Sequence, residues 1–492
     1  MKFRRLAAAL PRPLILLLVT TALLGASWAL LVPPWQAPDE PAHFGYAQTL
    51  AERGEPPQTE GERIFSTEHD AAAAAIGSDQ LAGNLFARPE WGRAVYERWR
   101  ALQAGFGSDA RSNGDGASPD GGNNSARTNP PLYYAFEAVP YYVGAGTDLF
   151  GRLYLMRLWS ALLLLVAAAA TWALIGELLG RRPGLQLVGA AVVGLQPMAV
   201  FVGASVNPDA MLIAAFAVTM WLGVRVISHG LTTANGIALC AATAVAVLTK
   251  ATGYALLPAV ALALAAGAWR AGVRVRPGSL AAAAPPLLAL VLPVGGWLLY
   301  ARLSDRPAVN QIDVGGGEGF DHAGPFSYLW QFYLPDIPGQ LPLPTGYPAI
   351  PAIDFWIEGF WGKFGWLEIE LPGPLYVVVG VLSAVLIAGA GVALVRSGLR
   401  RHGVVAAFLG LVALALLGGL HLTEYRLLAG QNAVFNQGRY LLPLLPLLGL
   451  AAAATTSLLR PRSQQLVAGA LVGFLLVLQI VALAIVGARF YA

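Results

Sequence analysis

Long apolar stretches set the strongest limit on what this chain can fold into. A helix that crosses a bilayer needs about 20 mostly apolar residues, and eleven stretches approach or exceed that length. They are 13–33, 157–179, 184–204, 208–228, 234–250, 252–271, 279–301, 373–395, 403–422, 440–459 and 465–488. None alternates with period two, which argues against an outer-membrane β-barrel. We therefore expect an all-α polytopic membrane protein, in which residues 1–492 form one integral membrane domain with about 11 transmembrane helices.

The charged residues support this class and indicate an orientation. Only 12% of the residues are charged, whereas soluble domains carry about 25%. Basic residues, and no acidic ones, occupy the short connectors on one side of the predicted bundle: Lys2, Arg4, Arg5, Arg12, Arg181, Arg182, Arg225, Arg270, Arg274, Arg276, Arg396, Arg400, Arg401, Arg460 and Arg462. The positive-inside rule makes this side cytoplasmic. We expect a multi-pass plasma-membrane protein with a cytoplasmic N-terminus, whose net charge of +4 reflects contact with lipid and no nucleic-acid partner.

Two long segments, 34–156 and 302–372, are expected to face the extracytoplasmic side. The first contains a short predicted helix over 38–53, which Gly54 can end. The second ends in the aromatic run DFWIEGFWGKFGWLE over 354–368, whose spacing predicts an interfacial amphipathic helix. The alternative is a belt of aromatic residues at the membrane surface with no substrate role.

The strongest candidate for chemistry is the motif PDEPAH, which follows the first predicted span and contains Asp39, Glu40 and His43. Asp39 and His43 are four residues apart, so they share one face of a helix. A carboxylate or a histidine here could act as a general base. The alternative is a capped helix whose acids lie at the positive end of the dipole. The position of the motif just outside the membrane favours the catalytic interpretation.

Further candidates lie where other predicted spans reach the same side. They are the substrate-binding candidates Arg439, Lys250, Asp209, Asn207, Tyr440 and His421. Arg439 and Lys250 are cations that could bind a substrate phosphate, or could extend to the phosphates of membrane lipids. Asn207 and Asp209, in the sequence NPD, could serve the same cavity or only cap a helix.

Several common catalytic arrangements are absent from the sequence. Cys240 is the single cysteine, which excludes a disulfide framework and a cysteine-based metal cluster. The chain has no GxxxxGK[ST] phosphate loop, no GxSxG elbow and no HExxH motif. The cytoplasmic connectors are too short to hold a nucleotide-binding domain.

A basic N-terminus, one span and then an acidic motif on the first outer helix resemble the GT-C superfamily of membrane glycosyltransferases. The later segments NPD, LTK and QGRYLLPLLPLL are similar to the DUF2142 family of predicted bacterial membrane proteins. The resemblance implies that Asp39 is the catalytic base, that Glu40 is its neighbour in the acidic pair, and that Asp209 lies near a second acidic position. Arg439 and Lys250 lie where contacts to the donor phosphate would be expected.

The resemblance also implies a reaction. A sugar on a polyprenyl-phosphate donor would be transferred, with inversion, to a hydroxyl of a cell-envelope glycan, lipid or other acceptor on the extracytoplasmic face. Some GT-C families use a divalent cation and others do not, which leaves this cofactor open. The alternatives are a transporter or flippase for lipid-linked saccharides, and a non-catalytic envelope assembly protein.

Overall fold

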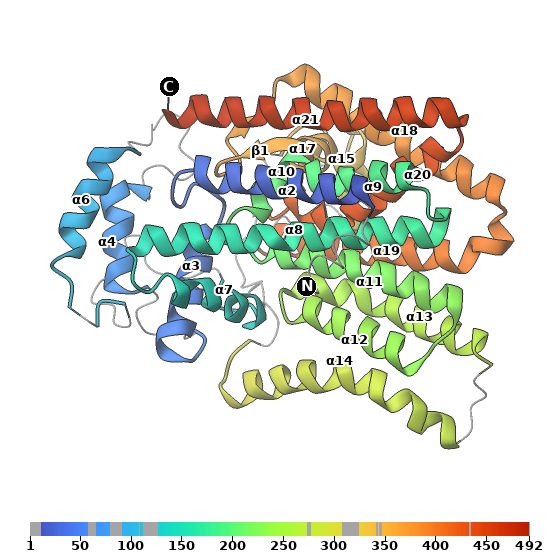
Figure 1. The fold of residues 1–492 in the computed structure, drawn as a ribbon, viewed down its shortest axis with the longest axis horizontal. Coiled ribbons are helices and arrows are strands. Elements are labelled where there is room, and N and C mark those ends of the chain that lie inside the picture. Colours follow the sequence, from blue (N-terminus) through green and yellow to red (C-terminus); the bar gives the residue numbers. More distant parts are fainter. Residues whose placement is uncertain are drawn as a thin grey trace.

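The computed structural model describes residues 11–57, 65–78, 91–107, 109–111, 126–272, 277–307, 324–340, 343, 347–431 and 434–491. Among the basic residues assigned to the cytoplasmic side, Lys2, Arg4, Arg5, Arg274 and Arg276 lie outside these ranges. The described chain is almost wholly helical. Long helices run side by side, and the short helices between residues 40 and 103 lie at one end of them (Figure 1).

Nine helices in the described ranges are long and apolar enough to cross a membrane. They are α2 (Arg12–Leu31), α8 (Leu149–Leu179), α11 (Asp209–His229), η1 (Ala251–Leu256) joined to α13 (Leu257–Arg270), α14 (Pro277–Leu303), α18 (Gly373–Ser397), α19 (Leu399–Gln431), η3 (Gly438–Leu444) joined to α20 (Leu445–Ser457), and α21 (Pro461–Tyr491). A tenth span forms if α9 (Pro183–Leu195) and α10 (Pro197–Gly203), bent by 56° at their junction, are counted together.

All eleven predicted stretches are helical, but the number of full spans is nine or ten. The difference arises at α12 (Thr233–Val247), which is only 15 residues long, and in the lower count also at the bent pair α9 and α10. Leu248, Thr249 and the extended residue Lys250 end this helix before the next one begins. The fold class predicted from the apolar pattern is thus confirmed, and the spans are fewer than the count of apolar stretches.

The short elements come from the two long segments, 34–156 and 302–372, that the sequence predicts to lie outside the membrane. The first segment forms α3 (Glu40–Arg53), α4 (Thr67–Ile76), α6 (Arg93–Gln103) and α7 (Leu132–Val143). The second forms α15 (Pro325–Tyr333), α16 (Pro351–Ile353), one π-helical turn η2 (Asp354–Glu358), α17 (Gly359–Gly362) and an antiparallel hairpin of β1 (Lys363–Phe364) and β2 (Ile369–Glu370). The helix predicted over 38–53 is therefore present, and Gly54 ends it with a φ of 75°.

The prediction of an interfacial helix over 354–368 is wrong. The helical part ends at Gly362, and the hairpin that follows contains Gly365 with a φ of 63°. The aromatic rings are not a surface belt either, because Phe360, Trp361 and Phe364 are buried in the main core. Phe364 packs on the ring of Trp28, with 5.0 Å between centroids. Aromatic spacing alone did not reveal that these rings face protein and not lipid.

Small residues allow the central helices to pack closely. A Cβ added to Gly189 in α9 would come within 2.5 Å of the carbonyl oxygen of Gly449 in α20, and the reverse substitution would be as tight. Such contacts between small residues are a common means of association for helices in lipid. They bring α9 and α20 together in the bundle, beside α8 and α18.

Candidate functional site

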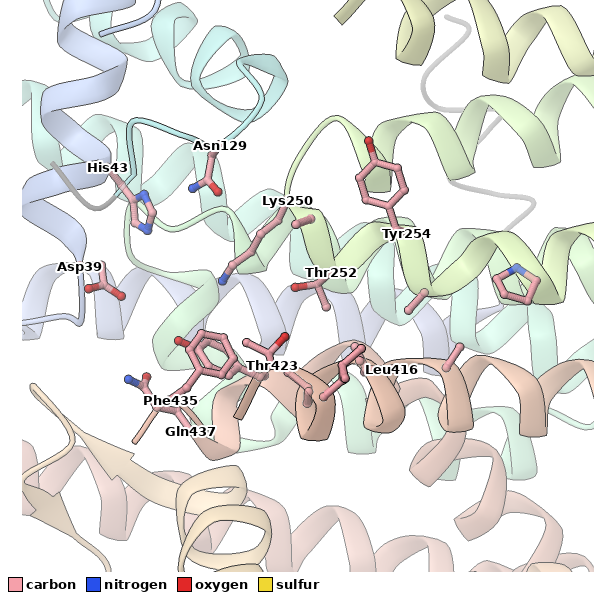
Figure 2. Close-up of a pocket in the computed structure, with 18 of the residues that line it drawn as sticks. Asp39, His43, Asn129, Lys250, Thr252, Tyr254, Leu416, Thr423, Phe435 and Gln437 are labelled. Atoms are coloured by element: carbon pink, nitrogen blue, oxygen red, sulfur yellow. The ribbon is translucent and has the colours of Figure 1, made fainter. Parts of the chain in front are cut away.

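A cavity of about 940 Å³ lies where α3, η1, α13, α14 and α19 meet (Figure 2). Its polar end is lined by Asp39, His43, Asn129, Lys250 and Gln437. The rest of its wall is largely apolar and comes from helices that qualify as spans, with Pro258, Leu298, Ala415, Leu416 and Leu420 among the lining residues. The cavity thus joins a charged end to an apolar wall in the span region.

Asp39 lies at the charged end and does not cap α3. It holds the N-cap position in the left-handed backbone conformation (φ 62°), but its side chain makes no capping hydrogen bond to the described residues. Its carboxylate instead accepts a hydrogen bond from the guanidinium of Arg439, with which it forms an ion pair. Arg439 also donates to the carbonyl oxygen of Pro38 at 3.4 Å. The segments PDEPAH and QGRY, about 400 residues apart in sequence, therefore meet in one site.

The surroundings of Asp39 and His43 set their charge. Burial would raise the pKa of Asp39, but the attraction of Arg439, His43 and Lys250 outweighs burial and lowers this pKa to about 2. Burial lowers the pKa of His43 to about 4, against the opposing effect of Asp39. At neutral pH the carboxylate is therefore ionised and the imidazole is neutral. The Nδ1 atom of His43 lies 2.9 Å from the hydroxyl of Tyr134.

Lys250 forms the second ion pair of the site, with Asp209. Its Nζ donates to Asp209 Oδ1 at 2.7 Å and lies 4.9 Å from the ring centroid of Tyr440. The other oxygen of Asp209 is buried without a hydrogen-bond partner in the described structure. In Figure 2, Lys250 extends toward the space beside Asp39 and His43. It lines the cavity, so extension to membrane lipid does not account for its position.

Asn207 connects the two acidic segments. Its Oδ1 accepts the backbone N–H of Asp209 at 2.9 Å, which is the helix-start role expected for the NPD sequence. Its Nδ2 also donates to the carbonyl oxygen of Pro38 at 3.3 Å. The side chain is buried and is not part of the cavity wall. Asn207 therefore holds the start of α11 against the segment that carries Asp39.

Glu40 does not reach the cavity, although the sequence made it a catalytic candidate. It is fully buried and forms an ion pair with Arg157 of α8, at 2.5 Å between Oε2 and Nη2. Its carboxylate also accepts the N–H groups of Trp35 at 3.0 Å and Val206 at 3.1 Å. Every oxygen is thus engaged with protein, and the geometry supports a positioning role.

Arg157 is the residue of this group that the motifs did not reveal. Besides Glu40, it donates to the carbonyl oxygens of Ala29, Val32 and Pro33 at the end of α2. It ties the first span to α3 and α8, directly before Asp39. An arginine at the start of the predicted apolar stretch 157–179 was the available signal, and α8 begins two turns earlier at Leu149, so this charge lies inside the helix and needs a buried partner.

His421 lies outside the cavity wall. Its two ring nitrogens are 2.9 Å and 2.7 Å from the hydroxyls of Tyr328 and Tyr333, so it anchors α15 to α19. The chain beyond the predicted span 403–422 is also helical, since α19 continues to Gln431. Within this extension Glu424 accepts the N–H groups of Phe435 and Asn436, at 2.8 Å and 2.7 Å. These hydrogen bonds hold the segment Phe435–Asn436, which leads to Arg439.

Sequence motifs also missed several neutral residues of the wall, namely Asn129, Thr252, Tyr254, Thr423 and Phe435. In the described ranges, no group of three or more His, Cys, Asp or Glu side chains is arranged to hold a metal ion. A divalent cation bound by three such side chains therefore has no site among these residues.

The chain belongs to the family described as "Predicted membrane protein (DUF2142)", whose family model matches residues 22–448. ArnT from Cupriavidus metallidurans in the apo state shares the fold, with a TM-score of 0.53 and 13% identity over 96% of this chain and 76% of that chain. ArnT bound to undecaprenyl phosphate aligns with a TM-score of 0.47 and 16% identity, over 91% of this chain and 61% of that chain.

The archaeal oligosaccharyltransferase AglB from Archaeoglobus fulgidus aligns with a TM-score of 0.44 and 11% identity, over 97% of this chain and 55% of that chain. A search of curated proteins found no match to the chain. ArnT is a GT-C glycosyltransferase, so the chain has a GT-C-like fold. The similarity to ArnT carries information about fold alone.

Proposed function

We propose that this member of the DUF2142 family is a membrane glycosyltransferase that uses a polyprenyl-phosphate sugar as its donor. The observation that carries the proposal is the cavity beside Asp39, which has this carboxylate and Lys250 at one end and an apolar wall over the rest, with Arg439 paired to Asp39 next to it. A lipid-linked phosphosugar has the same division into a charged head and an apolar tail. The GT-C-like fold is consistent with this assignment.

The donor phosphate would lie between Arg439 and Lys250. Both cations contact the ring of Tyr440, at 5.4 Å and 4.9 Å from its centroid, so they approach one another from two different segments. An arginine offers a forked pair of donors to a phosphate, and a lysine offers a compact charge. The prenyl chain would follow the apolar wall toward Leu298 and Leu416.

Asp39 is the proposed base. The acceptor hydroxyl would give its proton to the Asp39 carboxylate as its oxygen bonds to C1 of the sugar. The bond between C1 and the phosphate oxygen breaks, and polyprenyl phosphate leaves with the electron pair. Attack opposite to the leaving group inverts the anomeric centre. Arg439 and Lys250 would stabilise the charge on the departing phosphate.

Donor binding would also prepare the base. Without donor, Arg439 is the main attraction that lowers the pKa of Asp39 to about 2, where a carboxylate is a weak base. A phosphate that binds Arg439 competes with Asp39 for the guanidinium and adds a nearby negative charge. Both effects raise the pKa of Asp39 toward the range in which it accepts a proton.

The protein would sit in the plasma membrane with its N-terminus in the cytoplasm and this cavity on the extracytoplasmic side. The acceptor would be a hydroxyl of a cell-envelope glycan, lipid or other envelope molecule. Asn129 and His43 line the polar end on the side of the first extramembrane segment. That side would receive the acceptor, while the apolar wall receives the donor.

The direct test is Asp39→Asn, which keeps the side-chain shape and removes the base. Membranes with wild-type protein should release labelled sugar from one or more of a panel of radiolabelled polyprenyl-phosphate hexose and pentose donors. Membranes with Asp39→Asn should lose this release by at least 100-fold. Asp336→Asn is the matched control, because Asp336 is exposed outside the cavity.

Three outcomes would contradict the proposal. An Asp39→Asn protein with wild-type transfer would remove the proposed base. Movement of a fluorescent lipid-linked sugar across liposomes that contain the purified protein, without any product, would favour a flippase. A protein with neither activity, in which Asp39→Asn changes only thermal stability, would favour the assembly role.

A further inference from the structure

Two further hollows, an apolar groove and a polar cavity, lie at the end of the long helices opposite to Asp39. An apolar groove of about 560 Å³ runs between α18, α19 and α20 and reaches Leu178 and Leu179 at the end of α8. Arg157, near the first site, precedes Leu178 by 21 residues on the same helix, which separates the two regions by roughly 30 Å at 1.5 Å per residue. This end lies away from α3, α4 and α6 in Figure 1.

The groove is open because small residues line it without a packing partner. A Cβ added to Gly391 in α18 or Gly410 in α19 would meet no other atom within 4 Å. Small residues usually let membrane helices approach closely, as Gly189 and Gly449 do in this fold. Here they leave space between helices that qualify as spans. In a bilayer such a space is filled by an apolar chain.

A polar cavity of about 510 Å³ adjoins the groove. The two hollows share Leu178, His402 and Val405 as wall residues. The polar cavity is also lined by Glu177 and Arg270. One hollow is thus suited to an acyl chain, and its neighbour is suited to a charged headgroup.

The charges around the polar cavity have a positive excess. Glu177 is already balanced, since it accepts hydrogen bonds from Arg225 at 2.7 Å and His229 at 2.8 Å. Arg270 lines the polar cavity, and Arg396 lines the groove. Neither arginine has a carboxylate partner in the described part of the chain. Guanidinium groups of this kind bind phosphate through paired hydrogen bonds.

We propose that this end of the protein binds one anionic glycerophospholipid. An acyl chain occupies the groove beside Gly410, and the headgroup phosphate contacts the guanidinium groups of Arg270 and Arg396 and the ring of His402 at the adjoining cavity. In the orientation proposed above, the lipid belongs to the cytoplasmic leaflet. This site is separate from the donor cavity, so the inference stands independently of glycosyl transfer.

The test uses full-length purified protein in detergent and measures bound lipid by native mass spectrometry. The probe is dioleoylphosphatidylglycerol, with dioleoylphosphatidylcholine as the neutral comparison. Wild-type protein should retain the anionic lipid at least 10-fold better than the neutral one. Gly410→Leu fills the groove, and Arg270→Gln with Arg396→Gln removes the cations. Each change should reduce retention of the anionic lipid at least 10-fold.

Gly418→Leu is the matched control, because Gly418 lies on the same helix, has equal space around it and is outside the groove. It should retain the lipid as the wild type does. Unchanged retention in Gly410→Leu would refute the acyl-chain position. Equal retention of the two lipids would refute the role of the cations. Displacement of the anionic lipid by polyprenyl phosphate would assign the groove to the donor's chain and overturn the proposal.

Discussion

The ion pair between Asp39 and Arg439 leads to a prediction that separates binding from chemistry. Asp39→Asn should bind polyprenyl phosphate more tightly than the wild type while it loses transfer. The carboxylate competes with a phosphate for Arg439 and also repels it. Asparagine tolerates the left-handed backbone conformation of this position as well as aspartate does, so the site should keep its shape.

The magnitude follows from the charges. Two like unit charges about 6 Å apart interact by roughly 3 kcal/mol at an effective dielectric constant of about 20. The Asp39 side chain is 36% exposed, so solvent screening reduces the effect to about 1–2 kcal/mol. Affinity for the lipid phosphate should therefore rise about 5- to 30-fold.

The assay is titration of a fluorescent polyprenyl phosphate into purified protein in nanodiscs, with the wild type, Asp39→Asn and the control Asp336→Asn side by side. The gain in affinity should shrink as salt is added, because screening weakens the repulsion that the substitution removes. Unchanged or weaker binding by Asp39→Asn would refute the idea that the phosphate lies beside Arg439.

Three further predictions concern packing and buried charge. Gly438→Ala places a Cβ 2.2 Å from the backbone of η2 and α17, so it should displace Arg439 and weaken lipid-phosphate binding at least 10-fold in the same titration. Glu40→Gln leaves the guanidinium of Arg157 buried without its counter-charge and should cost about 3–5 kcal/mol, whereas the double variant with Arg157→Met should recover much of the thermal stability in detergent. Burial raises the pKa of Glu137 to about 8, so its folded state binds a proton more tightly than the unfolded state, and stability falls as pH rises from about 4.5 to 8. Glu137→Gln should therefore raise the melting temperature at pH 8 and match the wild type near pH 4.

The apolar pattern was sufficient to predict the fold class, because a helix long enough for a bilayer leaves a local signature. It also located the start and end of α3, where Gly54 is visible as a stop signal. The motifs at Asp39, Lys250 and Arg439 converge because each lies at the same end of its apolar stretch. Sequence patterns can therefore bring together residues that are hundreds of positions apart, provided that the chain crosses the membrane between them.

The parts that sequence did not reveal depend on partners that are distant and have no spacing rule. Glu40 looked like half of a catalytic pair, and only the buried Arg157, 117 residues later, explains its orientation. His421 carries the right chemistry for a site, yet two tyrosines of α15 occupy both ring nitrogens. The hairpin after Gly362 was not predicted, because the spacing of the aromatic residues fits a helix and a buried turn equally well.

The two ion pairs beside the cavity, Asp39–Arg439 and Asp209–Lys250, also bear on substrate selectivity. In the resting protein Arg439 and Lys250 each already hold a carboxylate, so a small anion such as free phosphate or a soluble nucleotide sugar gains little by displacing it. A polyprenyl tail holds its phosphate in the bilayer beside the cavity and so raises the local concentration of the donor there. Under the proposed function, water-soluble phosphosugars lack this anchorage, and the tail is the feature that separates substrates from them.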